Sequence, residues 1–501
     1  MMTPPLALQS FGKEHFGAAR LGDQRRTRSL VDLADRFARH PRGSLPEKCK
    51  DPNALRRCYD LMKCPPVTHQ SVLEPHLRRT RELLLQQHGV VLVVHDPTEL
   101  DFSGLTSLAA HLGQIGDGHG KGYLCHNSLA VLPKDKTVLG LLSQILHCRD
   151  EVPKDETPAQ CAARESRESL LWLKAVGAID QAVGQTCRCK GLKEFPESLL
   201  VVDVSDRASD TFEFLDEEDR LQRHYVVRSK ANRRIRIGHD DTGAETLLHA
   251  YLRTLPLHEG QRQVTIGGRD GQPSRAAVVR LAFAAVVVLP PQGHPGKYRK
   301  VPQKVWAIRV WESDPPAGVE AVEWFLLTNL AVADEAAAWE KVDWYCCRWV
   351  VEEFHKAQKT GCNIEDPQFT FVERLQPMIA LLSVVAITLL NLRDRSRDAR
   401  LRDLPATVVT DEESVDILSG WRYREQRPLS VRAFFLALAR LGGHQNRKCD
   451  GEPGWLVLWR GWITLQQMVA GARASRCPKP DPACAAASGD AAHVKPPESG
   501  P

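Results

Sequence analysis

The sequence lacks the features of a secreted or membrane-spanning protein. No basic N-terminal stretch is followed by an apolar run, and the longest apolar segment is Met378–Leu390. This segment is shorter than the roughly 20 residues that a bilayer-spanning helix needs. We therefore expect a buried helix at this position, and a cytosolic protein with no membrane partner.

Cysteines are present, but not in the pairs that bind zinc. The chain has 14 cysteines, and the nearest approaches to a motif are Cys187-x-Cys189 and the adjacent Cys346 and Cys347. A structural zinc site takes four ligands, usually from two closely spaced pairs. We expect reduced, mostly buried thiols instead.

A strong overall charge is also missing. The 501 residues carry a formal net charge of +5, which by itself does not indicate nucleic acid binding. The charge is uneven, however, because residues 1–88 hold sixteen Lys and Arg against nine Asp and Glu. This local excess suits contact with phosphates, although a solvated basic face gives the same pattern.

Residues 1–75 have the pattern of a small helical domain. Apolar residues recur there at helical spacing, at Leu30, Leu33, Ala34 and Phe37. They follow a basic cluster formed by Arg25, Arg26 and Arg28. The spacing predicts a helix with one buried face and a basic start.

Residues 76–237 read as strands and helices of an α/β fold. Val90–Val94 and Leu199–Val204 are continuous apolar runs, typical of strands buried on both faces. Asp96 is expected at the C-terminal end of the first strand and Asp206 just after the second. Four further elements are predicted: antiparallel strands at Tyr123–Leu132 and Thr137–Ile145, a helix at Thr157–Val176, and a strand at Tyr225–Lys230.

The rest of the chain divides into four further regions. Residues 238–329 are rich in strand patterns and are interpreted as an all-β insertion. Helices are expected again in residues 330–395 and in residues 396–475. Residues 476–501, rich in Ala, Pro, Ser and Gly, are predicted to be disordered.

One predicted helix, within Ala333–Thr360, carries a distinctive set of polar residues. On a regular helix four side chains fall within a roughly 60° arc: Tyr345, Arg348, Glu352 and Lys359. Apolar residues occupy the opposite side, and Glu353 points off the polar stripe. The pattern favours Glu352 as a functional acid, although a solvated amphipathic helix with internal ion pairs would look the same.

Three carboxylates at such positions suggest metal chemistry. Asp96, Asp206 and Glu352 could converge from two strands and one helix. Such a set can hold two divalent ions about 4 Å apart for an in-line phosphoryl transfer. Oxygen ligands of this kind suit Mg²⁺, with Mn²⁺ as a substitute.

The polar helix also carries a resemblance. Its run from Tyr345 to Gly361, including Trp349 and Lys356, resembles the Tyr-Arg-Glu-Lys signature of the insertion sequence four family of DDE transposases. Asp96, in Val-Val-His-Asp-Pro-Thr, resembles the first aspartate of that family. Asp206, in Asp-Arg-Ala-Ser-Asp, resembles the second, with Asp203 as a rival inside the strand.

The resemblance implies a fold and a function. It implies an RNase H-like core in residues 76–237 and 330–395, interrupted by the insertion at 238–329. It also implies an N-terminal domain that binds transposon ends and a C-terminal dimerisation region. The expected activity is cut-and-paste transposition of double-stranded DNA through a hairpin, by a homodimer with two Mg²⁺ ions in each active site. The expected location is the bacterial cytoplasm, on the nucleoid when bound to DNA.

The resemblance also implies which residues touch DNA. Trp324 stands where the family has a tryptophan that takes up a flipped base, although burial in the β core is the alternative. The expected DNA-binding residues are Tyr345, Arg348, Lys359, Trp324, Arg228, Lys230, Lys356, Trp349, Arg25, Arg26 and Arg28. Two other functions remain open: a metal-dependent nuclease without strand transfer, and a catalytically silent DNA-binding regulator derived from a transposase.

Overall fold

The fold is α/β, with helices at both ends of the chain and one large mixed sheet between them. The computed structural model describes residues 11–150, 152, 155–187, 198–240, 242–266, 275–292, 298–447 and 450–476. Contacts divide the chain into two compact units, Ala7–Arg395 and Met1–Leu6 with Ser396–Pro501. Cys189 and the predicted tail beyond Arg476 lie outside the described residues.

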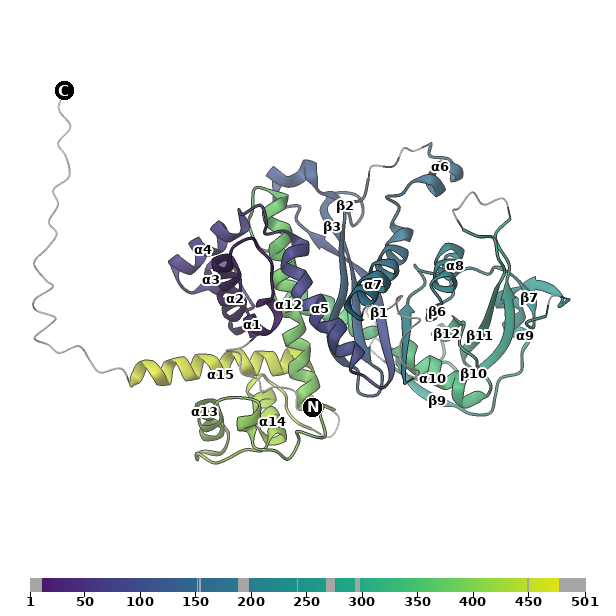
Figure 1. The fold of residues 1–501 in the computed structure, drawn as a ribbon. Coiled ribbons are helices and arrows are strands. Elements are labelled where there is room, and N and C mark those ends of the chain that lie inside the picture. The colour runs from purple at the N-terminus through teal and green to yellow at the C-terminus, as the bar shows by residue number, and fades with distance from the viewer. Residues whose placement is uncertain are drawn as a thin grey trace, which may run out of the picture. The chain divides into compact units, whose positions relative to one another are not determined.

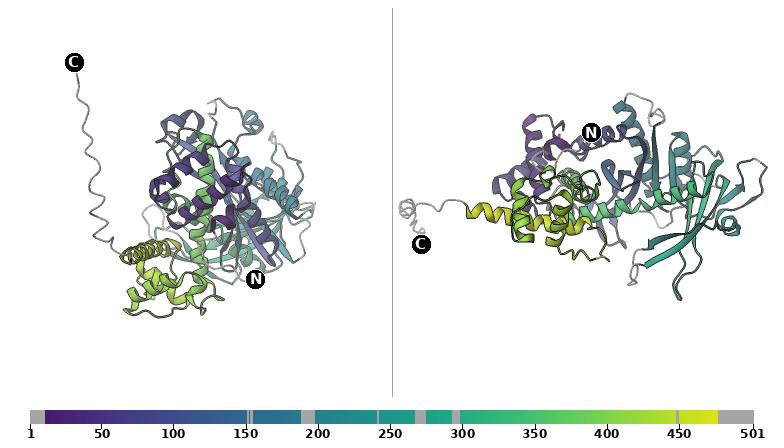
Figure 2. Two further views of the ribbon diagram at one scale, coloured as in Figure 1. Left: turned by 60° about the vertical axis from the view of Figure 1, so that its left-hand side comes forward. Right: turned by 90° about the horizontal axis from the view of Figure 1, so that it is seen from below.

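Five helices begin the larger unit: α1 (Phe11–Phe16), α2 (Gln24–Arg39), α3 (Leu45–Cys49), α4 (Pro52–Met62) and α5 (His69–Leu85). The predicted apolar face of α2 is buried. Asp23 caps this helix, since its side chain accepts a hydrogen bond from the Arg25 backbone N–H. In Figures 1 and 2 these helices lie at one end of the unit and strands β7–β11 at the other.

The sheet has twelve strands in the order β2-β3-β1-β5-β6-β12-β11-β10-β7-β8, with β4 paired to β3 and β9 paired to β10. The strands are β1 (Gly89–Asp101), β2 (Gly113–Ile115), β3 (Gly120–Leu132), β4 (Thr137–His147), β5 (Leu199–Ser205), β6 (His224–Arg228), β7 (Arg234–Ile237), β8 (Glu245–Leu247), β9 (Arg262–Ile266), β10 (Arg275–Val288), β11 (Gln303–Glu312) and β12 (Glu323–Thr328). The pair β3 and β4 is antiparallel, as predicted.

Strand β1 is longer than its apolar run. It was expected to end near Asp96, but it continues to Asp101. The extension is held by β3, because residues 96–101 pair antiparallel with residues 122–127. The parallel pairing of β1 with β5 stops earlier, at His95 and Ser205.

One predicted helix is interrupted. The helix expected at Thr157–Val176 is instead α6 (Pro158–Ala163), a short 3-10 turn (Glu168–Leu170) and α7 (Leu171–Cys187). The chain leaves α6 because Arg164 is extended, with φ −70° and ψ 115°. Helix α8 (Phe212–Arg220) follows β5.

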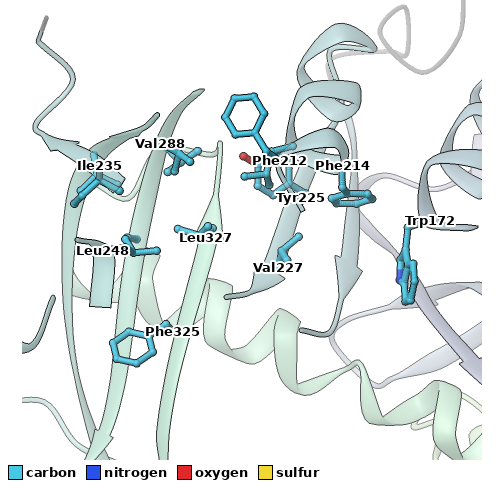
Figure 3. Close-up of a cluster of buried hydrophobic side chains, with 14 of the residues drawn as sticks. Trp172, Phe212, Phe214, Tyr225, Val227, Ile235, Leu248, Val288, Phe325 and Leu327 are labelled. Carbon is cyan, nitrogen blue, oxygen red and sulfur yellow. The ribbon is translucent and has the colours of Figure 1, made fainter. Parts of the chain in front are cut away.

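The region 238–329 is not all-β, because α9 (Leu248–Thr254) lies within it. Leu248 and Leu252, one helical turn apart, are both fully buried, and this burial outweighs the surrounding strand pattern. The region also shares the sheet with the core, since β12 pairs antiparallel with β6. Figure 3 shows the apolar cluster that joins them, with Phe325 and Leu327 on one side and Val227 on the other.

The helix expected at Ala333–Thr360 is broken twice. It forms α10 (Glu335–Cys346), α11 (Trp349–Lys356) and a π-helical turn (Ala357–Gly361). At the first break Arg348 N–H donates to Tyr345 O at 2.9 Å, three residues back instead of the four of an α-helix. At the second, Cys362 N–H donates to Ala357 O at 2.8 Å, five residues back.

Helix α12 (Val372–Arg397) is longer than the predicted apolar segment. By length and composition it is the one helix of the described chain that could cross a membrane, but 83% of its apolar window is buried inside the protein. A core helix passes the same test, so this is weak evidence for a membrane span.

The smaller unit contains α13 (Glu412–Tyr423), α14 (Val431–Leu441), α15 (Trp455–Ser475) and a 3-10 turn (Ala406–Val408). Helices α14 and α15 touch at Gly442 and Gly461. A Cβ atom at Gly461 would lie 1.9 Å from the Leu438 carbonyl oxygen, so only glycine permits this approach.

Candidate active site

Asp96 and Asp206 lie at the same edge of two neighbouring parallel strands. The β1–β5 pairing ends at His95 and Ser205, and each aspartate is the next residue along its strand. Asp206 then leaves the sheet in a turn, where its Oδ1 accepts a hydrogen bond of 2.9 Å from the Ala208 N–H. Backbone register therefore brings together two acids that are far apart in sequence.

Asp203, the rival of Asp206, is committed elsewhere. Its side chain is fully buried, with Oδ1 2.7 Å from His95 Nε2 and Oδ2 accepting a 2.8 Å bond from Arg223 Nε. His95 in turn lies 2.9 Å from the Ser128 hydroxyl. This cluster ties β1, β3 and β5 together, and it leaves Asp206 as the accessible acid.

Arg348 joins Asp96 to Glu352. Its Nη1 lies 3.5 Å from Asp96 Oδ2, and its Nη2 donates to Glu352 Oε1 at 2.7 Å. The side chains of Arg348, Asp96 and Glu352 are 8%, 14% and 45% exposed. The neighbouring Glu353 points away and pairs with Arg393, as its position off the stripe predicted.

Burial and the nearby carboxylates both raise the pKa of Asp96. Burial raises the pKa of Asp96 to about 7, the Arg348 guanidinium opposes the rise, and the Asp206 and Glu352 carboxylates add to it. The Asp206 and Glu352 carboxylates therefore both act on Asp96 electrostatically. Such an under-compensated group of carboxylates favours a bound cation.

The donor chemistry fits a divalent metal, but the ligands are not gathered. Carboxylate oxygens are the ligands that Mg²⁺ and Mn²⁺ take in proteins. Within the described residues, no group of three or more His, Cys, Asp or Glu side chains is arranged to hold an ion. Arg348 occupies the space between two of the expected ligands.

Tyr345 and Trp324 pack together below the surface. Tyr345 was expected on an exposed face with Glu352, but it is buried, because α10 ends before Arg348 and the four polar residues do not share one helix. Its ring meets Trp324 edge-on at 5.9 Å, and the Arg228 guanidinium lies 5.8 Å from the Trp324 ring. Trp324 is only 8% exposed, which agrees with the alternative of burial.

The other expected residues of the signature are nearer to solvent. Lys359 lies in the π-helical turn and its Nζ is 3.5 Å from Glu365, which also accepts a bond from the Asp101 N–H. Trp349 is 40% exposed, and the Arg348 guanidinium lies 4.6 Å from its ring. Lys356 is exposed on α11.

Asp210 organises the segment that carries Lys230, a role the sequence did not reveal. Its Oδ2 accepts bonds from the Lys230 N–H at 2.6 Å and the Ala231 N–H at 2.9 Å, and its Oδ1 pairs with Arg233. Lys230 itself is exposed, and Arg228 is partly buried.

Two histidines near the acids were also missed. His355 is buried and bonds to the backbone of Asp96, linking α11 to β1. His95 directly follows the apolar run Val90–Val94, and this position was the available signal, because a buried polar side chain needs a partner.

The three N-terminal arginines differ in exposure. Arg25 and Arg28 are exposed on α2, whereas Arg26 donates to the Leu21 carbonyl oxygen at 2.9 Å and holds the segment before the helix. This N-terminal region is also where the chain matches a known protein family. Residues 9–67, which include α1–α4, match the family described as transposase DNA-binding. The match supports a transposase that binds DNA.

Proposed function

We propose that this protein is a DDE transposase of the insertion sequence four family. It excises a DNA element through a hairpin intermediate and joins the 3′ ends to target DNA. The proposal includes a homodimer that holds both element ends and two Mg²⁺ ions, replaceable by Mn²⁺, in each active site. It also places the protein in the bacterial cytoplasm, on the nucleoid when DNA is bound.

The observation that best supports the proposal is that three acids from distant parts of the chain are brought together, since the register of β1 with β5 places Asp96 beside Asp206 and Arg348 contacts both Asp96 and Glu352. Asp96 is sensitive to the charges of both Asp206 and Glu352. The strands β4-β3-β1-β5-β6, with β3 antiparallel to β1 and both β5 and β6 parallel, are the part that we assign to an RNase H-like core. The match of residues 9–67 to transposase DNA-binding domains supports the same conclusion independently.

In this mechanism the protein side chains hold and orient the reacting groups. Asp96, Asp206 and Glu352 bind the ions through carboxylate oxygens. Bound Mg²⁺ would activate a water or 3′-hydroxyl nucleophile and stabilise the leaving oxygen of each phosphoryl transfer. Arg348 and Lys359 bind phosphate oxygens beside the cut without reading sequence.

Tyr345 acts from a buried position, where it packs against the same Trp324 ring that the Arg228 guanidinium contacts. Arg228 and the exposed Lys230 contribute further phosphate contacts at the end of β6. The same three carboxylates serve the first nick, hairpin formation, hairpin opening and joining to target DNA, because each step is a phosphoryl transfer.

A nuclease without strand transfer is the second candidate. The acids alone do not distinguish a water nucleophile from a 3′-hydroxyl. The burial of Trp324 favours this alternative, since a ring that is 8% exposed must move before it can take up a base.

The test is incubation of the purified chain, with Mg²⁺ or Ca²⁺, on labelled DNA that carries both native flanks of its gene. The products are resolved on a denaturing gel. Mg²⁺-dependent hairpins and joined products would establish the transposase. Nicks alone would establish the nuclease, and binding without cleavage would indicate a silent DNA-binding regulator.

A further inference from the structure

We propose that Arg348 is an internal counter-ion that must leave Asp96 and Glu352 before these acids can gather around a divalent cation. This inference rests on the proposed function, because it concerns the same metal site. It predicts that Arg348 opposes metal binding in the free protein, in addition to its expected contact with DNA phosphate.

The contacts of Arg348 make it a competitor for the metal. Its guanidinium reaches Asp96 Oδ2 at 3.5 Å and Glu352 Oε1 at 2.7 Å, so it uses the oxygens that an ion would need. A guanidinium and a divalent cation repel each other strongly at such distances, above all in a half-buried site. The two cannot share these carboxylates without a large penalty.

The hold on Arg348 is incomplete, which favours its release. Its Nε is buried and finds no hydrogen-bond partner within the described part of the chain. The contact to Asp96, at 3.5 Å, is at the outer limit of a hydrogen bond. The guanidinium also lies 4.6 Å from the ring of Trp349, whose side chain is 40% exposed.

The same exchange couples the metal to DNA. When Arg348 leaves the acids, its planar guanidinium is free to bind two oxygens of a phosphate. A DNA phosphate at the site would therefore draw Arg348 away and make room for the ion. This accounts for two expected ligands that contact Arg348 while no three of the described ligand-type side chains form a ready metal site.

The first experiment measures Mn²⁺ affinity of the full chain without DNA, from the loss of the free Mn²⁺ signal in electron paramagnetic resonance. Arg348→Met should bind Mn²⁺ about tenfold more tightly than the wild type, within the usual range of coupling between two sites. Lys359→Met is the matched control, because Lys359 pairs with Glu365 and its removal changes the net charge equally. Adding Glu352→Gln to Arg348→Met should abolish the gain.

The second experiment uses the wild type, so it does not depend on how Arg348→Met folds. Arg348 moves away from the Trp349 ring when it leaves the acids, so Mg²⁺ should change the fluorescence of Trp349. The chain has 11 tryptophans, and Trp349→Phe identifies the part that belongs to this one. The Mg²⁺-dependent change should be lost in Trp349→Phe.

The outcomes separate the two proposals. Equal or weaker Mn²⁺ binding by Arg348→Met, with binding by the wild type intact, would overturn the role of Arg348 and leave the metal site standing. An equal gain in Lys359→Met would overturn it too, because general charge would then explain the result. No Mn²⁺ binding by any of these proteins would overturn both proposals.

Discussion

Asp203 on β5 and Asp96 on β1 lie on neighbouring strands, and they differ in how completely their charge is neutralised. Asp203 is fully buried between His95 and Arg223, which together lower its pKa despite the opposing effect of burial. Asp96, on the neighbouring strand, has its pKa raised to about 7 by burial and by like charges that Arg348 only partly offsets. The satisfied acid, Asp203, holds the sheet together, whereas the charge of Asp96 is only partly compensated.

The largest expected effect concerns Glu352, the more exposed of the two acids that Arg348 contacts. Glu352→Gln removes a charge that we propose binds the metal, so it should reduce DNA cleavage on the order of 10³-fold or more while end binding is retained. The measurement is cleavage on gels alongside a mobility-shift assay. Glu353→Gln, which breaks the pair with Arg393 instead, should keep most of the activity. Equal losses in the two variants would remove the distinction between them.

The next effect concerns the satisfied group. Asp203→Asn leaves Arg223 buried without its main partner, and breaking such a pair typically costs about 3–5 kcal/mol. The free energy of unfolding, from urea denaturation followed by circular dichroism, should fall by that order. A loss similar to that of a surface Asp→Asn variant would contradict the structural role.

The third effect depends on pH, and it distinguishes Asp96, whose pKa is raised, from Asp203, whose pKa is lowered. Because the pKa of Asp96 is higher in the folded protein, at about 7, than its unfolded value of about 3.9, the protonated form favours folding. This stabilisation is complete below about pH 4 and is lost as pH rises to about 7. In a metal chelator, Asp96→Asn should therefore gain up to about 4 kcal/mol of folding free energy relative to the wild type between these pH values. A constant difference across that range would contradict the prediction.

The smallest effect extends the comparison to the arginines of α2. Arg25→Ala and Arg28→Ala remove exposed charges, so each should weaken DNA binding a few-fold and lower the salt dependence by about one phosphate contact. Arg26→Ala should reduce thermal stability instead, because Arg26 holds the Leu21 carbonyl. Salt titration of DNA binding checks the first expectation and thermal unfolding the second. Identical salt slopes for all three variants would contradict it.

The sequence predicted the elements whose pattern is local. The strands that carry Asp96 and Asp206 follow from continuous apolar runs, and helix α2 follows from its apolar spacing. The match at residues 9–67 agrees with the expected DNA-binding role of the N-terminal region. These features depend on nearby residues alone.

The rest depends on contacts between distant residues. The break before Arg348 lies in a stretch without glycine or proline, so no strong helix breaker marks it. The burial of Tyr345 comes from its contact with Trp324 of β12 and from the packing of α10 on β6, and the Arg348 bridge needs β1 and α11 side by side. Periodicity can place residues on one face, but it cannot reveal what covers that face.

The register of β1 against β5 has a consequence for how such a chain can change over time. The alignment of His95 with Ser205 fixes where Asp96 and Asp206 emerge, whatever connects the two strands. The loops of the connecting segment can therefore gain, lose or exchange residues without moving the two acids apart, whereas β3, which pairs with β1, cannot. A single inserted residue inside either strand would instead turn every following side chain to the opposite face. Insertions and deletions are thus tolerated in the loops of the connection, but not within the paired residues of β1 and β5 on either side of it.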